Sequence, residues 1–247
     1  ELNVGRFTAL SAKSETDHDS VGLEEINLVG GTYAFSDNLS TSLYYSDVKD
    51  AFEKVYGNVN YNLGLGADQS LAFDFNIYQT EYESEFTGTG SDEDNTIWSL
   101  ASTYALGAHS FTVAYQKSHG GYDTTGYTYG IDGGGTVWLS NSVQYSDFYY
   151  EDEQSWQVRY DLDMTTYGVS GLSFMTRYVD GSNINMGAGN PDAEESEWDI
   201  EAKYVFQEGP AKDLSLRVRQ AFYQATNGLD NDLSDTRLIV EYPLSIL

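Results

Sequence analysis

Hydrophobic and polar residues alternate along residues 196–206. The apolar positions are Trp198, Ile200, Ala202, Tyr204 and Phe206, and the positions between them include Glu197, Asp199, Glu201 and Lys203. Because side chains of a β-strand point alternately to its two faces, this segment is predicted to be a strand with one apolar and one charged face. Residues 214–223 repeat the pattern, with Arg217 and Arg219 on the polar face.

The same alternation predicts twelve strands over the chain. They are expected near residues 1–10, 24–36, 38–48, 52–63, 70–82, 95–106, 109–119, 154–166, 171–181, 195–207, 213–225 and 236–246. Their apolar positions are rich in aromatic residues, and the 21 tyrosines and only 3 prolines also favour strands. No helical period and no alternation of strands with helices occurs, which excludes an α/β fold. We therefore predict an all-β protein.

The connections between these strands differ in length from one end of the sheet to the other. Short segments rich in Gly, Asp and Asn lie at 35–40, 63–70, 105–110, 165–171 and 206–214. Most alternate connections are long and polar and lie at 11–23, 83–94, 120–153, 182–194 and 226–235, whereas the link near 47–50 is short. Short turns at one end and long loops at the other are typical of outer-membrane barrels. Residues 1–247 are thus predicted to be a single transmembrane antiparallel up-and-down β-barrel domain.

Aromatic residues support the membrane interpretation. Those expected near the short-turn end, where a girdle would meet the membrane interface, are Tyr33, Phe35, Tyr61, Tyr104, Phe206 and Tyr242. No apolar stretch approaches the roughly 18 residues that a membrane helix needs, and hydropathy averages −0.45, but neither measure detects membrane strands. The alternative is a soluble β-sandwich with an aromatic core, in which all twelve polar faces would face solvent.

Composition narrows the classes of function. The chain has 39 acidic and 12 basic residues and a formal charge of −27, which argues against nucleic-acid binding. It has no cysteine, which excludes disulfides and thiolate metal sites. Because Glu1 begins in the middle of a predicted strand, we expect a processed or truncated chain.

Half of the basic residues lie on the polar faces of the last five predicted strands. These six are Arg159, Arg177, Lys203, Arg217, Arg219 and Arg237. Consecutive strands of a barrel form one continuous wall, so these side chains are predicted to make a basic ladder along the lumen, as in pores that select anions. Acidic residues are expected in the same lumen, namely Asp161, Asp163, Glu197, Asp199, Glu201 and Glu241. The alternative is ion pairing that only stabilises the wall.

The sequence gives only weak signals for metal binding and for catalysis. The acidic surplus lies mainly in the long loops, where a stretch such as 230–235 could bind Ca²⁺ weakly, although its spacing matches no EF-hand loop. The three histidines are His18, His109 and His119. Ser118 precedes His119, so the two point to opposite faces of a strand, and no nucleophile–base pair is evident. We expect no enzyme and no cofactor.

Several stretches resemble the OprD family of pseudomonad outer-membrane porins, also called outer-membrane carboxylate channels. They are DQSLAFDFNIYQT (68–80), NSVQYSDF (141–148), SWQVRYDLDM (155–164), GPAKDLSLRVRQAFYQA (209–225) and the terminal RLIVEYPLSIL (237–247). The resemblance spans essentially the whole chain. It implies a bacterial outer-membrane location and passive uptake of basic amino acids, peptides, or aromatic and other small carboxylates.

The resemblance also implies roles for particular residues. Lys203, Arg217, Arg219 and Arg237 match part of the family's lumenal ladder. Residues 120–153 match an inward-folding constriction loop, in which Ser142, Tyr145 and Asp147 would line the narrow zone and Asp147 would meet the cationic end of a substrate. The family barrel has about eighteen strands, so the twelve predicted here correspond to its C-terminal two-thirds, and we favour a fragment over a shortened barrel.

The predicted function is thus a substrate-selective porin for small carboxylate solutes, without a cofactor. The expected partners are these solutes, outer-membrane lipid and lipopolysaccharide, with a monomer or weak homotrimer as the assembly. The alternatives are a structural or adhesive barrel with a closed lumen, or an outer-membrane hydrolase.

Overall fold

The computed structural model describes residues 1–9, 25–88, 90–120 and 138–244. Twelve strands account for most of them: β1 (Leu2–Phe7), β2 (Ile26–Ser36), β3 (Leu39–Val48), β4 (Phe52–Gly66), β5 (Gln69–Tyr82), β6 (Glu93–Leu106), β7 (His109–Gly120), β8 (Gln154–Asp163), β9 (Leu172–Ile184), β10 (Ala193–Val205), β11 (Ser215–Ala225) and β12 (Leu233–Glu241). The predicted all-β class and the twelve strands are confirmed.

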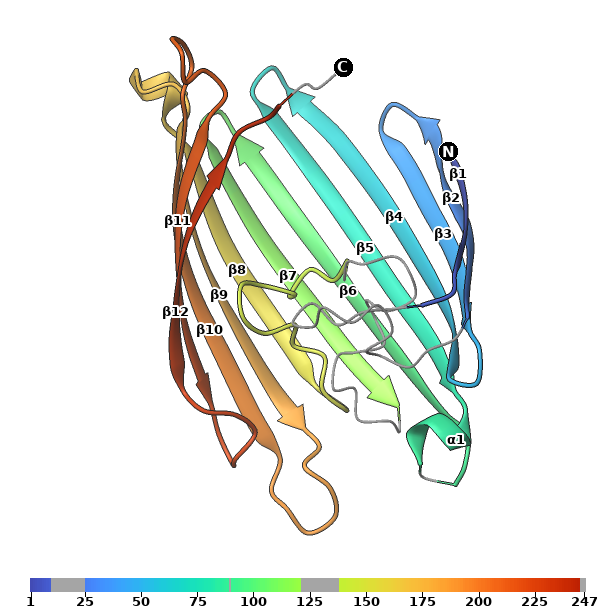
Figure 1. Cartoon of the computed structure of the whole chain (residues 1–247). Helices are drawn as coiled ribbons and strands as arrows, with labels where there is room; N and C mark the ends of the chain where they lie inside the picture. The colour runs from blue at the N-terminus through green and yellow to red at the C-terminus, as the bar shows by residue number, and fades with distance from the viewer. Residues whose placement is uncertain (10–24, 89, 121–137, 245–247) are drawn as a thin grey trace.

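The strands form one antiparallel meander. Each pairs with its neighbours in sequence, in the order β1 to β12, and among the described strands β1 and β12 are paired on one side only. Figure 1 shows the sheet curving around a central space, with β1–β5 on one side and β8–β12 on the other. The described part of the chain contains one short α-helix, α1 (Ser84–Thr87), and a 3₁₀ turn, η1 (Met164–Tyr167). No helix in that part is long and apolar enough to cross a membrane.

The two faces of the sheet have opposite polarity, and the apolar face is the exposed one. Trp198 is 47% exposed and Phe222 is 41% exposed, whereas their neighbours along the strands, Glu197 and Ala221, are buried. Many buried polar side chains belong to the inner face, including Asn76, Ser99, Gln116, Gln157 and Asp199. A soluble sandwich would bury its apolar face instead. The soluble alternative is therefore wrong, and the apolar face is the one that meets lipid.

Several predicted girdle residues are exposed on this outer face. Tyr33, Phe35, Tyr61 and Tyr242 are exposed, while Tyr104 and Phe206 are half-buried. The rings of Tyr33 and Phe35 meet edge to face at 4.8 Å, and Tyr104 donates a hydrogen bond to Gln69. Partly apolar rings with a polar tip suit the boundary between lipid and water.

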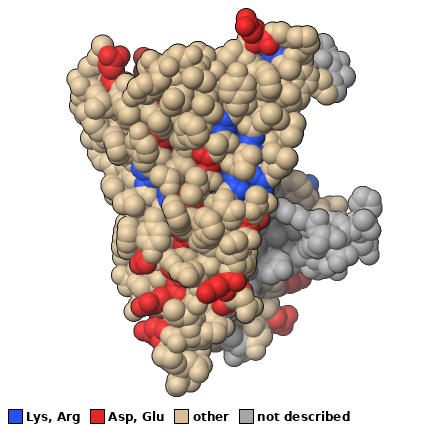
Figure 2. All heavy atoms as spheres, turned by 90° about the vertical axis from the view of Figure 1, so that its left-hand side faces the viewer, with Lys and Arg blue, Asp and Glu red and all other residues tan. Residues whose placement is uncertain are grey.

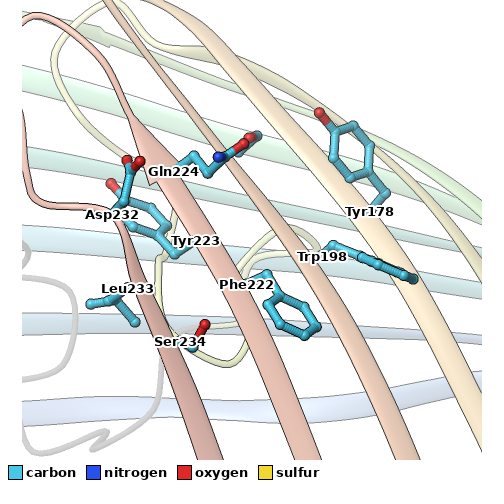
Figure 3. A pocket seen from close by; sticks show the side chains of 9 residues that line it. Tyr178, Trp198, Phe222, Tyr223, Gln224, Asp232, Leu233 and Ser234 are labelled. Atoms are coloured by element: carbon cyan, nitrogen blue, oxygen red, sulfur yellow. The ribbon is translucent and has the colours of Figure 1, made fainter.

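A hollow of about 620 Å³ lies near the loop end of β9–β12 (Figure 3). Exposed aromatic side chains of three neighbouring strands, Tyr178, Trp198 and Phe222, line it on the outer face. Trp198 lies opposite both of the others in the strand register. The hollow therefore belongs to the membrane-facing surface rather than to the lumen.

Some predicted boundaries were wrong. Residues 164–166, expected in a strand, belong to the turn η1, because the Asp163 side chain accepts the backbone N–H of Thr165 and Gly168 ends the turn with a left-handed φ of 86°. β9 and β4 each extend three residues beyond the predicted ends. β12 begins at Leu233 and ends at Glu241, so 242–244 lie outside it. Such ends depend on pairing with the neighbouring strand, which the hydrophobic pattern does not encode.

Candidate functional site in the lumen

The predicted basic residues lie on three successive levels of the inner face of β8–β12, which we call the charged wall. The register places Arg159 opposite Arg177, Arg219 opposite Arg237, and Lys203 opposite Arg217. Each level therefore carries two cations. Levels are two residues apart along each strand, or about 7 Å. The structure brings all six predicted cations together on one wall.

Carboxylates lie among these cations and pair with five of them. Arg159 contacts Asp161 at 2.7 and 2.8 Å, and Arg177 contacts Asp199 at 2.6 Å. Arg237 contacts Asp235 at 2.6 Å. The Arg177–Asp199 pair is the most enclosed, with side chains 10% and 2% exposed. Planar Arg–carboxylate contacts of this kind fix both partners in place.

Glu201 is shared by two arginines on adjacent levels. Its carboxylate pairs with Arg219 and lies 3.7 Å from Arg217, which also contacts Glu241 at 3.6 Å. Lys203 has no ion-pair partner among the described residues. The third level, which carries Lys203 and Arg217, is thus the least neutralised part of the wall.

The described half of the predicted constriction loop, residues 138–153, is bonded to the charged wall by its backbone. Glu197 accepts the N–H groups of Tyr145 at 2.9 Å and Ser146 at 2.8 Å. Glu195 accepts the hydroxyls of Ser146 at 2.7 Å and Tyr223 at 2.5 Å. These two buried carboxylates find donors in the loop, which offsets part of the cost of burying them.

The beginning of this segment is bonded to the other side of the lumen. The backbone N–H of Trp138 donates to the Tyr78 hydroxyl at 2.9 Å, and that of Ser140 donates to Ser99 at 3.0 Å. The Gln144 side chain then reaches the backbone carbonyl of Asp235 on β12 at 2.9 Å. Figure 1 shows this yellow-green segment inside the curve of the sheet. The segment therefore crosses the space between β5 and β12.

Buried amides hold the middle of the segment. Gln116 of β7 donates to the carbonyls of Asp147 and Phe148 at 2.8 and 2.7 Å and accepts the N–H of Asn141 at 3.0 Å. Gln157 of β8 donates to the Ser140 carbonyl at 2.7 Å. A buried glutamine that bonds a loop backbone replaces the water those groups would otherwise bind.

The three residues predicted to line the narrow zone lie in this segment. Ser142 donates to the Asp147 carboxylate. The Tyr145 hydroxyl donates to Asp230 at 2.7 Å, and this bond, together with partial burial, raises the pKa of Tyr145 to about 12. The first part of the predicted loop, residues 121–137, lies outside the described residues.

Glu153 is the most enclosed acid at the end of the segment. It is fully buried and accepts the N–H of Tyr150 at 2.9 Å, and its carboxyl group also shares a side-chain hydrogen bond with Glu195. Burial raises its pKa well above the ordinary value of 4.5, and the nearby charge of Glu195 raises it further. Glu153 therefore favours its neutral form.

The strands on the other side of the lumen carry few charges. Across β4 and β5, Asn58 donates to Asp74 at 2.8 Å and to Asn76 at 2.9 Å, and Asn76 donates to Asp74 at 2.9 Å. Tyr56 donates to Asn76 at 2.7 Å. We call the inner face of β3–β5 the neutral wall, because amides and tyrosines dominate it.

Charge is also distributed along the length of the molecule. Figure 2 shows Lys and Arg atoms near mid-height, while many of the Asp and Glu atoms in view lie toward the lower end, where the long loops are. In the described residues no group of three or more His, Cys, Asp and Glu side chains could hold a metal ion. His18 lies outside that part. Ser118 is buried and the neighbouring His119 is exposed, as the strand pattern predicted.

Sequence reasoning missed the acids and amides that hold the loop. Glu195 belongs to none of the predicted sites, and Glu197 is predicted only as a lumenal charge. Gln116 and Gln157 fall on predicted polar faces, but the pattern does not predict that they bind a segment 17 or more residues away. Only the fold supplies that proximity.

An antiparallel meander with a lipid-facing apolar surface, a polar inner face and an inserted loop defines a membrane β-barrel of the porin class. The chain matches the family model described as "outer membrane porin, OprD family" over residues 1–246. The chain therefore belongs to the OprD family of bacterial outer-membrane porins.

Relatives agree with this assignment. The chain is 48% identical to Porin D of Pseudomonas aeruginosa over 274 residues, covering 100% of this chain and 61% of that protein. It is 29% identical to the porin-like protein GalP of Pseudomonas putida, covering 100% of this chain and 59% of that protein. The chain thus spans about three-fifths of the length of these relatives. The first is named a porin and the second a porin-like protein.

Solved structures show the same fold. The crystal structure of Pseudomonas aeruginosa OprD superposes with a TM-score of 0.83 at 44% identity, covering 100% of this chain and 66% of that one. That of Acinetobacter baumannii OccAB1 gives a TM-score of 0.91 at 30% identity, covering 100% and 65%.

Proposed function

We propose that this chain forms the wall of a substrate-selective porin through which small carboxylate solutes diffuse passively along the charged wall. The observation that carries the proposal is the placement of six of only 12 basic residues as three levels of two cations on one lumenal surface. Ion pairing that served stability alone would not require this succession of levels.

The ion pairs suggest how a solute would move. Five of the six cations already hold a protein carboxylate, so a solute carboxylate would exchange with that partner rather than bind a bare charge. Such exchange keeps binding weak, and conduction requires sites that a solute can leave. The third level would give the strongest attraction because Lys203 has no ion-pair partner among the described residues and Arg217 reaches its two carboxylates only at 3.6 and 3.7 Å.

The loop would set the width of the path. In this proposal residues 120–153 form the constriction, and Ser142, Tyr145 and Asp147 line it. Asp147 would receive the cationic end of a zwitterionic solute while the arginines receive its carboxylate. A basic amino acid and an aromatic carboxylate both fit this description, and lipid, lipopolysaccharide and a monomer or weak homotrimer are the proposed surroundings.

Planar-bilayer recording tests the proposal. The double variant Arg217→Ala/Arg219→Ala should shift ion selectivity toward cations and shorten current blockage by acetate and propionate. Lys212→Ala removes a cation from the exposed turn between β10 and β11 and serves as the matched control. Unchanged selectivity and carboxylate blockage in the double variant would refute the charged wall as the solute path. Absence of any conductance would favour a structural barrel with a closed lumen.

A further inference from the structure

The outer face of β9–β11 carries a row of large aromatic side chains at one level of the sheet. The register places Tyr178 of β9 opposite Trp198 of β10, and Trp198 opposite Phe222 of β11. All three rings are exposed and line the hollow of about 620 Å³ on the membrane-facing surface (Figure 3). This volume lies within the range of about 300–1,000 Å³ for sites that bind small molecules. We call this space the outer hollow.

Ring packing and a small neighbour keep the outer hollow open. The Trp198 ring packs against Phe222, with centroids 5.6 Å apart, whereas the Tyr178 ring contacts Trp156 of β8 at 5.7 Å. Tyr178 and Trp198 lie opposite each other but contact rings on opposite sides. Ser234 of β12, which lies opposite Phe222, continues the row with a side chain too small to fill the space. The side chains at this level of the sheet therefore create the hollow.

The polar tips of two of these rings are already bonded to the protein. The Trp198 indole N–H donates to the Thr176 hydroxyl at 2.9 Å, and the Tyr178 hydroxyl donates to Asp180 at 3.2 Å. These bonds fix the rings before any ligand arrives, so little conformational entropy is lost on binding. They also leave apolar ring surface as the main contact that the row offers.

The next level of the outer face, two residues closer to the long loops, is polar. Ser196 of β10 lies opposite both Asp180 of β9 and Gln224 of β11. Asp232, which directly precedes β12, also lines the outer hollow and accepts the backbone N–H of Ala225 at 3.2 Å. Levels two residues apart are separated by about 7 Å. The outer hollow thus has an apolar aromatic part and a polar rim, the same order as in a lipid whose acyl chains end in a headgroup.

An aromatic band places this rim at the depth of lipid headgroups. Trp98 of β6 and Tyr115 of β7 have centroids 5.5 Å apart, and the Trp156–Tyr178 pair continues the band toward the outer hollow. Trp and Tyr concentrate where the membrane interior meets the headgroups. The predicted girdle lies at the short-turn end, whereas this band lies closer to the long loops. It therefore marks the second interface of the membrane.

The charge of the rim favours one class of headgroup. Asp180 and Asp232 carry carboxylates there, and the exposed Glu194 lies two residues beyond Ser196 on β10. None of the nine residues that line the outer hollow is Lys or Arg. A negative field of this kind repels an anionic headgroup and attracts an ammonium group. Exposed ion pairs are individually weak, so the rim would set a preference among lipids rather than a high affinity.

We propose that the outer hollow binds one phospholipid with an ammonium headgroup, of which phosphatidylethanolamine is the simplest example. An acyl chain lies against Trp198 and Phe222, and the ammonium group lies at the acidic rim near Asp232. The site is on the face of the sheet opposite to the charged wall, so it does not depend on the proposed solute path. A second copy of this chain fits less well, because docking by the same face would bring two acidic rims together.

Native mass spectrometry of the porin tests the site, with equimolar phosphatidylethanolamine and phosphatidylglycerol of identical acyl chains added in detergent. EDTA is present so that no divalent cation bridges a phosphate to the carboxylates. We expect one retained phosphatidylethanolamine per chain and a roughly threefold preference over phosphatidylglycerol, the range for an exposed ion pair. Asp232→Asn keeps the oxygen that accepts the Ala225 N–H and should remove most of this preference without removing the lipid.

A matched pair of phenylalanine variants locates the lipid. Phe222→Ala should lower the retention of both lipids by roughly threefold to tenfold, because one aromatic contact is lost. Phe174→Ala is the control, since Phe174 of β9 is 42% exposed on the outer face, against 41% for Phe222, but does not line the outer hollow. Retention of both lipids should be unchanged in the control.

Four results would overturn the proposal. The first is equal retention of the two lipids by the unmodified porin, or a preference for phosphatidylglycerol. The second is an equal loss of lipid in Phe222→Ala and Phe174→Ala. The third is a full preference for phosphatidylethanolamine in Asp232→Asn. The fourth is a lipid-free dimer or trimer that disappears in Phe222→Ala, since a second copy would then occupy the outer hollow.

Discussion

The charged wall and the neutral wall are built from the same kind of strand, yet they solve the burial of polar groups differently. On β8–β12, arginines pair with carboxylates, as in Arg177–Asp199 at 2.6 Å. On β3–β5, amides and phenols bond one another, as in Asn58–Asn76 at 2.9 Å. A carboxylate solute can compete for the first kind of contact, whereas the second offers it little gain in electrostatic energy. Selectivity for charge is therefore expected from one side of the lumen only.

The inserted loop contacts both walls, and its bonds differ in the same way. On the charged wall its backbone donates to the ionisable Glu197, and on the other side it donates to the neutral hydroxyls of Tyr78 and Ser99. Glu197 alone accepts two backbone N–H groups of the loop and Glu195 accepts the Ser146 hydroxyl as well, each bond contributing about 0.5–1.5 kcal/mol. The charged wall should therefore dominate the position of the loop.

The largest effect is expected from Glu197→Leu. This change removes the acceptor of two backbone N–H groups and should weaken the attachment of the loop by about 3 kcal/mol. Amide hydrogen exchange at Tyr145 and Ser146 should accelerate by roughly a hundredfold, and single-channel conductance should rise. Ser99→Ala is the control on the other side and should cause a smaller acceleration. Equal exchange rates in the two variants would show that the charged wall does not dominate.

Neutralising Glu201 should increase the difference between the two walls, because the charged wall would then carry a larger net positive charge. Glu201→Gln leaves Arg219 without its carboxylate and Arg217 with Glu241 alone. We expect anion over cation permeability to rise by roughly fivefold, the equivalent of about 1 kcal/mol for unit charges about 4 Å apart in water. Reversal potentials in a salt gradient measure this. An unchanged or lower anion preference would contradict the role given to the arginines.

The raised pKa of Glu153 predicts a pH effect at the end of the loop. Between its ordinary value of 4.5 and its raised pKa, Glu153 stays protonated in the attached loop but ionises in a detached one. Attachment should therefore weaken as pH rises through that window and remain weaker above it. Current fluctuations recorded from pH 4.5 upward should increase. Glu153→Gln should reduce the pH dependence, whereas Glu194→Gln, an exposed neighbour, should leave it unchanged.

The smallest effect on selectivity is expected on the neutral wall. Asn58→Ala removes hydrogen bonds to Asp74 and Asn76 and should lower the free energy of unfolding by about 1 kcal/mol. Reversal potentials should stay those of the unmodified porin. Urea unfolding in detergent measures the first quantity. A selectivity shift as large as that of Glu201→Gln would remove the distinction between the two walls.

The sequence predicts the strands and the direction of their faces well, because alternation is a local property. It also places Arg159, Arg177, Lys203, Arg217, Arg219 and Arg237 on one wall, since consecutive strands of a meander pair. It does not predict which acid neutralises which cation. That Glu201 serves both Arg217 and Arg219 depends on register, and register is set by turns and bulges.

The attachment of the loop is harder to predict from the sequence. Glu197 and Tyr145 are 52 residues apart in sequence, and their bond exists only once the loop has entered the lumen. The row of three tyrosines on the neutral wall is easier to predict from the sequence. Tyr44, Tyr56 and Tyr78 all fall at polar-face positions of predicted strands, and tyrosines there are a signal that a register-aware reading of the sequence could use.

The central claim is that solute carboxylates travel on the charged wall. Anomalous diffraction from crystals of the porin soaked in bromoacetate tests it most directly, because bromine marks the position of a small carboxylate with no aromatic ring. We expect lumenal bromine peaks beside Lys203, Arg217 and Arg219, and their loss in Arg217→Ala/Arg219→Ala crystals. Peaks confined to the neutral wall, or unchanged by the double substitution, would contradict the account.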